Sequence, residues 1–218
     1  AGVGFFFFFD HDVVEESNLQ RQILYGTSSI GMNKAIAAKK RLTDLNPSIM
    51  IQAFSEKLNT SNAVSLFEQY DIIVDGTDNF ESRYLINDAS LNTNKPVVYG
   101  AIYKFEGQLS VFNFKNGPSY RCLFPKPPSN DEGINCEEVG VLGVLPGIIG
   151  SLQANEVLKI ILGIGDVLSG MLYCYNAKTS GVFTTNIEKN NALVKQFKNS
   201  QLIKERPIKC NTSVNEIT

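Results

Sequence analysis

The chain has 218 residues, 43% of them hydrophobic and 19% charged, which is typical of a globular protein and excludes disordered, collagen-like and repeat classes. Twenty basic and 22 acidic residues give a net charge of −2, and no lysine- or arginine-rich run occurs, which argues against nucleic acid as a partner. An uncharged stretch, residues 139–154, is too short to span a membrane and contains a proline and four glycines. Composition therefore predicts a cytoplasmic protein without a membrane anchor.

Predicted strands and helices alternate in the first half of the chain. Phe5–Phe9 is a continuous apolar run that ends at Asp10, the pattern of a strand buried on both faces of a parallel sheet. A helix is predicted over Asn33–Asn46, because apolar residues recur at helical spacing and Pro47 prevents its continuation. This alternation predicts an α/β fold with a doubly wound, Rossmann-like, mostly parallel sheet. Further strands are expected over 49–54, 71–75 and 97–99, and helices over 61–69 and 80–91.

The second half of the chain has the pattern of an antiparallel extension. Residues 108–114 are rich in β-branched and aromatic side chains, and residues 171–175 and 182–187 form a predicted hairpin. A helix is predicted over 151–162, where Gly163 ends it. Two polar segments complete the chain: a long crossover loop over 126–138 and a tail from 189 onward. We therefore expect one domain over 1–188 and a linker or tail over 189–218.

Polar side chains follow the first predicted strand at its carboxyl end, where doubly wound folds bind ligands. Asp10 and Asp12 come directly after this strand, and in nucleotide-binding folds an acid there accepts hydrogen bonds from ribose hydroxyls. Asn18, Arg21 and Lys34 follow closely and would supply an amide and two cations for phosphates. This segment therefore has the composition of a nucleotide site.

A second group, Asp75, Asp78 and Asn79, follows the third predicted strand. Carboxylate oxygens of this kind suit Mg²⁺, which binds one or two carboxylates together with nucleotide phosphates. Each residue also has a structural alternative. A strand-end acid is often only a turn former, Asp78 could cap the next helix, and Arg21 and Lys34 could be ordinary surface cations.

The position of Asp10 has a consequence for the phosphate-binding loop. In the dinucleotide fingerprint, a glycine-rich loop begins about 20 residues before the acid. Only nine residues precede Asp10, and the chain begins with Ala1 rather than Met. We therefore expect that the loop and the strand before it lie upstream of Ala1, so that the domain lacks its first βα unit.

Several long motifs in a fixed order make the chain similar to a known family. The motifs are residues 10–22 (DHDVVEESNLQRQ), 76–84 (GTDNFESRY), 99–108 (YGAIYKFEGQ), 120–128 (YRCLFPKPP) and 140–156 (GVLGVLPGIIGSLQANE). They closely resemble the MoeB/ThiF/HesA family, adenylating enzymes that are related to the ubiquitin-activating enzyme and activate sulfur-carrier proteins. The resemblance covers Ala1 to about Ile187.

The resemblance implies an adenylyltransferase that uses ATP and Mg²⁺. The C-terminal carboxylate of a small ubiquitin-like sulfur carrier, of the MoaD or ThiS type and ending in Gly-Gly, would attack the α-phosphate of ATP. Such enzymes serve molybdopterin synthesis, thiamine synthesis or tRNA thiolation, and the resemblance also implies a homodimer. Asp10 would bind the ribose, and Asp78 would be the magnesium-associated carboxylate. Arg21, Lys34 and Asp78 are expected in catalysis, and Asp10, Asn18, Arg21, Lys34, Asp78 and Asn79 in cofactor binding.

The cysteines divide into different expected roles. Cys136 lies in the crossover loop, where the resemblance implies a thiol that can bond covalently to the carrier, and it is a candidate catalytic residue. The alternative is no covalent role, because Glu137 and Glu138 disfavour the reactive thiolate. Cys174 lies within a predicted strand and is expected in the core.

The zinc site of many relatives is not expected in this chain. It needs two Cys-x-x-Cys pairs, and the first pair would stand at residues 119–122, where Ser119 replaces one cysteine. No cysteine lies between residues 187 and 209, so four sulfur ligands are not available at the required positions. We predict no zinc site and a buried Cys122.

Three other functions are alternatives to adenylation. The strand and helix alternation alone also fits an NAD-dependent oxidoreductase, although an uncharged nicotinamide does not need two cations and Asp78. A non-catalytic carrier-binding module is a further alternative. A Ser-His-Asp hydrolase would have to use His11, yet no Gly-x-Ser-x-Gly elbow occurs. Residues 213–218 (SVNEIT) resemble the start of a rhodanese-like domain, which makes a sulfurtransferase a possible partner; a solvated terminus is the alternative.

Overall fold

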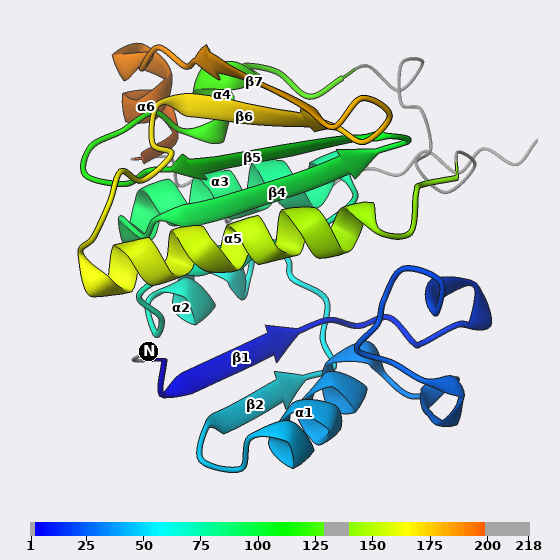
Figure 1. The fold of residues 1–218 in the computed structure, drawn as a ribbon. Coiled ribbons are helices and arrows are strands. Elements are labelled where there is room, and N and C mark those ends of the chain that lie inside the picture. Colours follow the sequence, from blue (N-terminus) through cyan, green and yellow to red (C-terminus); the bar gives the residue numbers. More distant parts are fainter. Residues whose placement is uncertain (1–2, 129–139, 199–218) are drawn as a thin grey trace, which may run out of the picture.

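The computed structural model describes residues 3–128 and 140–198 and contains two sheets (Figure 1). In the smaller sheet, β1 (Phe5–Phe9) and β2 (Met50–Phe54) pair in parallel, and α1 (Lys34–Leu45) packs against them. Asn33 caps α1 by accepting a hydrogen bond from the Ile36 amide. These elements confirm the strands and the helix that the sequence predicts here.

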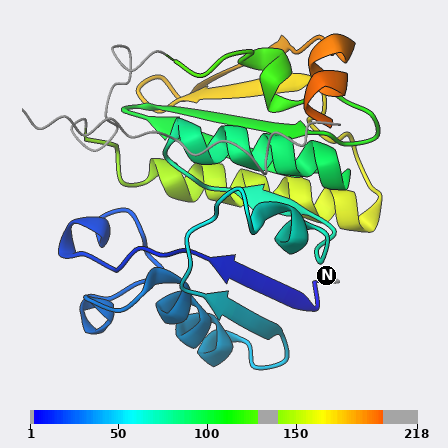
Figure 2. The same cartoon turned by 180° about the vertical axis from the view of Figure 1, so that it is seen from behind.

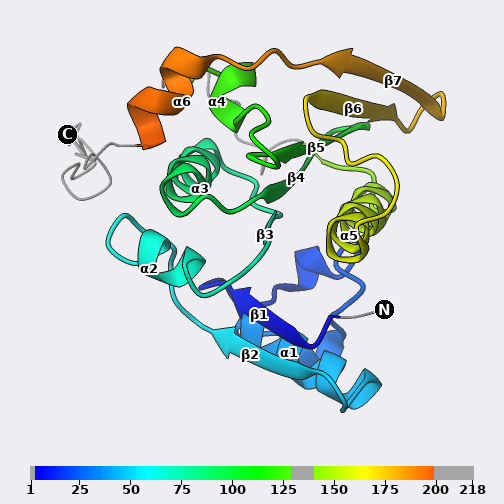
Figure 3. The ribbon, with the colours of Figure 1, turned by 90° about the vertical axis from the view of Figure 1, so that its left-hand side faces the viewer.

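The surroundings of β1 differ from the prediction, which was a strand buried on both faces of a sheet. Among the described residues β1 pairs with β2 alone, and Figure 3 shows β1 and β3 as neighbours in separate sheets. Phe5 and Phe6 are 43% and 40% exposed, so the strand is not fully buried on its faces. The two parts of the molecule touch at Phe7, whose ring centroid lies 4.1 Å from that of Tyr70.

The larger sheet has the strand order β3-β4-β5-β6-β7. β3 is parallel to β4, whereas every later neighbouring pair is antiparallel, so the predicted antiparallel extension is confirmed. The arrangement agrees with the predicted α/β class. The strands are β3 (Ile73–Asp75), β4 (Val97–Tyr103), β5 (Glu106–Phe112), β6 (Met171–Asn176) and β7 (Gly181–Asn186).

Helices cover the two faces of this sheet. α5 (Leu145–Leu162) lies along the face seen in Figure 1, and α3 (Phe80–Thr93) and α2 (Ala63–Phe67) lie on the face seen from behind in Figure 2. Because side chains alternate along a strand, Tyr99 of β4 packs toward α3 and Val98 packs toward α5. The core is therefore divided into two layers by β4 and β5.

The helix α5 begins six residues before its predicted start, with Pro146 in its first turn, a position that proline favours. It ends at Gly163, as predicted, with φ at +64°. By length and composition α5 could cross a membrane, but it packs along β4 and β5. Glycines permit this close approach, because a Cβ on Gly100 would lie 2.4 Å from Gln153 Cδ.

The predicted tail contains a helix that the sequence pattern did not reveal. α6 (Asn191–Lys198) packs against α3 and against α4 (Tyr120–Leu123). The Arg121 guanidinium lies 3.7 Å from the ring centroid of Phe197 and forms two hydrogen bonds with Asp88, at 2.6 and 2.7 Å. Residues 191–198 are thus part of the folded unit, and the rest of the predicted tail lies outside the described residues.

Candidate functional site

The two predicted groups of polar residues lie at the carboxyl ends of β1 and β3. β3 is parallel to β4, and Figure 1 shows β1 and β4 pointing the same way, so both ends lie toward one side of the molecule. At the β1 end, Asp10 Oδ1 accepts a hydrogen bond from the Asp12 amide at 2.9 Å. Asn33 Nδ2 donates to the Asp10 carbonyl at 2.8 Å, which ties the turn to the start of α1. Burial raises the pKa of Asp10, opposed by the hydrogen bond from Asp12.

Lys34 joins the same turn as the first residue of α1. Its Nζ lies 3.2 Å from Asp12 Oδ2, so the structure brings Lys34 together with the acids that follow β1. Tyr25, which the sequence analysis missed, donates its hydroxyl to the Lys34 carbonyl at 3.2 Å. Burial, together with the nearby Asp10 charge, raises the pKa of Tyr25 to about 12. The side-chain contacts of this turn come from within a short stretch of chain, and the Asp10 amide also donates to the Phe54 carbonyl of β2 at 3.1 Å.

Asn18 and Arg21 lie in and just after the 3₁₀ turn Glu16–Asn18. The Asn18 side chain is 6% exposed, and its Oδ1 accepts a hydrogen bond from the Glu15 amide at 3.2 Å. Arg21 Nη1 donates to the Ser17 carbonyl at 3.0 Å. Both side chains therefore have local structural partners, and their contact with phosphate stays a prediction.

The β3 end is built from buried groups. Asp75, the last residue of β3, is 3% exposed, and its Oδ1 accepts hydrogen bonds from Thr77 N at 2.9 Å and Thr77 Oγ1 at 2.7 Å. Arg83 of α3 donates from Nη2 and Nε to the Thr77 carbonyl, at 2.9 and 3.3 Å. Burial raises the pKa of Asp75, while the two hydrogen bonds from Thr77 and the Arg83 charge oppose the rise.

Gln153 holds the same strand end from the other face of the sheet. Its Nε2 donates to the Asp75 carbonyl at 2.8 Å and to the Val98 carbonyl at 3.1 Å. Gly100 makes room for this side chain, since any Cβ there would collide with it. The end of β3 is thus fixed by α3 on one side and by α5 on the other.

Asp78 and Asn79 follow this turn and have different surroundings. Asn79 Oδ1 accepts a hydrogen bond from the Ser82 amide at 2.8 Å and caps α3, so the alternative that Asp78 caps this helix is wrong. Asp78 is exposed, and within the described residues no hydrogen bond or ion pair engages its carboxylate. An exposed carboxylate without a protein partner fits the predicted binding of Mg²⁺.

A different group of acids also has metal-ligand spacing. Asp10, His11 and Asp12 offer ligand atoms that lie within 4.8 Å of one another. Within residues 3–128 and 140–198, no other group of three or more His, Cys, Asp or Glu side chains has its ligand atoms this close together. Asp78 is not part of this group. Exposed acids commonly gather without an ion, so the role of Asp78 as the magnesium carboxylate stays a prediction.

The cysteines have the following surroundings. Cys174 is 7% exposed within the core, as predicted, whereas Cys122 is half-buried rather than buried. Cys122 Sγ accepts hydrogen bonds from the Ser119 and Asn190 amides, both at 3.3 Å. The predicted absence of zinc stays a prediction, and Cys136 lies outside the described residues.

Comparisons with known proteins agree with this architecture. A model of the ThiF family matches residues 1–196. A probable molybdopterin-synthase adenylyltransferase of Porphyra purpurea is 50% identical over 180 residues, covering 82% of this chain and 47% of that protein. A sulfur carrier protein adenylyltransferase of Thermus thermophilus is 46% identical over 195 residues, covering 87% of this chain and 72% of that protein. The chain spans about half the length of several such relatives.

The fold also matches solved structures. The crystal structure of E. coli MccB with ATP superposes with a TM-score of 0.76 at 18% identity, covering 87% of this chain and 58% of the MccB chain. At this identity the match supports the fold alone. It confirms the predicted Rossmann-like α/β architecture.

Proposed function

Because the chain belongs to the ThiF family, we propose that its full-length protein adenylylates the C-terminal glycine of a small ubiquitin-like sulfur carrier. A carboxylate oxygen of the carrier attacks the α-phosphorus of ATP, and the bond from this phosphorus to the bridging oxygen breaks. The products are an acyl adenylate and pyrophosphate. The names of the Porphyra and Thermus relatives support this reaction, because both are described as adenylyltransferases.

The observation that carries the proposal is the pairing of cations at one strand end with an unengaged carboxylate at the other. Lys34 and Arg21 would neutralise the phosphates, and Asp10 would bind the ribose hydroxyls. Asp78 would hold Mg²⁺, which supplies charge neutralisation to the departing pyrophosphate when bound. The carrier brings its own nucleophile, so the protein has to align the reacting groups and stabilise charge.

Other properties of the full-length protein are part of the same proposal. We place it in the cytoplasm as a homodimer, with sulfur transfer to the carrier after adenylation. Cys136 would act only in that later step, so Cys136→Ala should leave adenylation unchanged. An NAD-dependent oxidoreductase is less favoured, because a nicotinamide does not need the cation pair or Asp78.

Carrier-dependent exchange of labelled pyrophosphate into ATP tests the proposal. In the full-length protein, Asp78→Ala and Arg21→Ala should each lower the exchange rate by at least about 100-fold, a loss typical of groups that stabilise transition-state charge. Their thermal unfolding should stay close to that of the wild type, because both side chains lie near solvent.

Matched controls distinguish the general effect of removing one charge from the loss of a residue in the site. Glu81 is an exposed acid in the first turn of α3, and Arg41 is an exposed cation that pairs with Asp44. Glu81→Ala and Arg41→Ala should retain exchange. A wild-type rate in Asp78→Ala would remove that residue from the site, and hydride transfer to NAD in place of exchange would overturn the function.

A further inference from the structure

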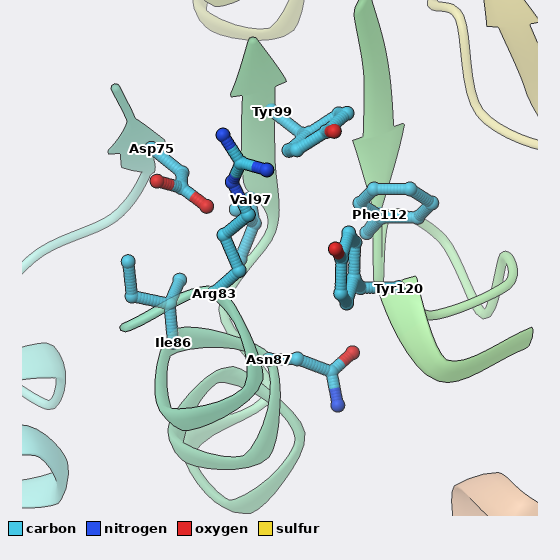
Figure 4. Close-up of a pocket in the computed structure, with 8 residues that line it drawn as sticks. All are labelled: Asp75, Arg83, Ile86, Asn87, Val97, Tyr99, Phe112 and Tyr120. Carbon is cyan, nitrogen blue, oxygen red and sulfur yellow. The ribbon is translucent and has the colours of Figure 1, made fainter. Parts of the chain in front are cut away.

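Arg83 is a buried cation at the junction of α3 and the β3 end. It is 9% exposed, and Figure 4 shows its guanidinium between Asp75 and the ring of Tyr99. The guanidinium carbon lies 5.6 Å from the ring centroid of Phe80 and 5.8 Å from that of Tyr99. These rings and the burial keep the charge away from solvent.

The space beside Arg83 is too small for a substrate. The cavity has a volume of about 10 Å³, which is room for about one water molecule. Two polar atoms of residues that line it, Asn87 Oδ1 and Tyr120 Oη, have no hydrogen-bond partner among the described residues. A nucleotide could not enter a space of this size. Arg83 therefore acts through the protein rather than on a ligand.

Arg83 is connected to Asp78 through the backbone of Thr77. Both hydrogen bonds from the guanidinium end on the carbonyl of Thr77, and the next residue along the chain is Asp78. Asp75 fixes the other side of the same residue through the Thr77 amide and hydroxyl. The residue before Asp78 is thus held at three polar atoms.

We propose that Arg83 is a positioning residue that holds the Thr77 carbonyl and thereby aims the Asp78 carboxylate at the metal and phosphates. This inference rests on the proposed function, because it takes Asp78 to be the magnesium carboxylate. It explains how the exposed carboxylate of Asp78 keeps a defined orientation. A misplacement of about 1 Å in such a group can lower a rate by about 100-fold.

The contact requires an arginine rather than any cation. The planar guanidinium offers two N–H groups to one carbonyl while its carbon lies 5.6 and 5.8 Å from two aromatic ring centroids, and a lysine ammonium is a compact point charge that cannot do both. Arg83→Lys therefore keeps the positive charge that faces Asp75 but loses the forked contact. This makes lysine the informative substitution.

The chain offers a matched control in Arg121. It is also buried, at 7% exposed, and also forms two hydrogen bonds, but these go to Asp88 beneath α6. Arg121→Lys removes a buried forked contact without touching the β3 end. A merely structural effect of losing a buried guanidinium should appear equally in both variants.

Hydrogen–deuterium exchange tests the positioning role without using the reaction. In Arg83→Lys, the segment 76–79 should exchange at least about 10-fold faster, equivalent to about 1.4 kcal/mol of lost protection. In Arg121→Lys it should exchange at the wild-type rate. Unchanged exchange of this segment in Arg83→Lys, or equal acceleration in both variants, would overturn the proposal.

The Mg²⁺ dependence of pyrophosphate exchange tests the link to Asp78. Arg83→Lys should raise the Mg²⁺ concentration for half-maximal rate by at least about five-fold, and the same substitution in an Asp78→Asn background should add little, because coupled sites are non-additive. An additive effect would contradict action through Asp78. Wild-type activity of Asp78→Asn would instead refute the proposed site, while the hydrogen-exchange result would still report on Arg83.

A second variant guards against loss of folding in Arg83→Lys. Thr77→Val keeps the shape of the side chain and the carbonyl but removes the hydrogen bond from Thr77 Oγ1 to Asp75. It should shift both the exchange of segment 76–79 and the Mg²⁺ dependence in the same direction as Arg83→Lys, by a smaller factor. A variant identical to wild type in both measurements would show that the turn needs no such support.

Discussion

The β1 end and the β3 end of the candidate site are constructed in different ways. At the β1 end the side-chain contacts join residues 10–34, and the ion pair between Lys34 and Asp12 has one partner that is 53% exposed. At the β3 end the contacts reach across the fold, from Asp75 to Gln153, through groups that are less than 10% exposed. The first end presents charge to solvent, whereas the second holds a turn in place.

The β1 end therefore supplies charge to the site, and the β3 end supplies a fixed geometry. Exposed ion pairs contribute little to stability, so Lys34 is free to exchange Asp12 for phosphate at small cost. Buried hydrogen bonds are costly to remove, so the turn before Asp78 keeps one conformation. Three measurements on the two ends would sharpen or break this comparison.

The largest effect is expected for Gln153→Ala at the β3 end. It removes two buried hydrogen bonds and leaves a cavity, so the free energy of unfolding should fall by about 2–4 kcal/mol in urea denaturation. Ser151→Ala, at an exposed neighbour on α5 whose hydroxyl donates to the Gly147 carbonyl, should change it by less than about 0.5 kcal/mol. Equal losses of unfolding free energy in the two variants would show that Gln153 does not stabilise the β3 end.

The next effect concerns alkaline stability, because burial raises the pKa of Tyr99 and of Tyr25 to about 12. The unfolded chain loses these protons near pH 10, whereas the folded protein keeps them until about pH 12, so stability falls as pH rises through this window. Tyr99→Phe should remove part of that fall, on the order of 2 kcal/mol at its upper end. The measurement is the free energy of unfolding as a function of pH.

Tyr25→Phe provides the comparison at the β1 end. Tyr25 is only half-buried, and water screens its surroundings, so this variant should flatten the alkaline fall less than Tyr99→Phe does. If Tyr25→Phe flattened the curve more, the β1 end would be the less solvated of the two.

The smallest effect is expected for Lys34→Met. It breaks an exposed ion pair, so the free energy of unfolding should change by less than about 1 kcal/mol. Lys39→Met, on an exposed face of α1, controls for the loss of one positive charge. A loss above about 2 kcal/mol, the range of buried networks, would show that Lys34 supports the fold as strongly as Gln153 does.

The β1 end could be predicted from sequence because its parts are close together along the chain. Asp10 follows an apolar strand, and Lys34 begins a helix whose far end Pro47 marks, so local rules place both residues. Tyr25 was missed because a single tyrosine in a turn has no periodic signal. The exposed edge of β1 was also missed, since an apolar run does not show whether a strand has partners on both sides.

The β3 end was predicted only in part. Asp75 and Asp78 are visible as acids after a strand, but Gln153 lies 78 residues away from the carbonyl that it binds. Arg83 stands within a recognisable motif, yet its role depends on burial and on the direction of its donors. The helix α6 escaped prediction because it is short and its packing partners lie on α3 and α4.

The amino-acid sequence by itself determined the order of the strands and the longer helices, the family and the presence of acids and cations at two strand ends. Local periodicity, caps and breakers carry this information, because they act between residues a few positions apart. Only the tertiary structure decided which of these groups are buried and what holds them. Burial and long-range hydrogen bonds depend on which surfaces meet, and this made Arg83 and Gln153, rather than the cations at the β1 end, the groups that hold the turn before Asp78.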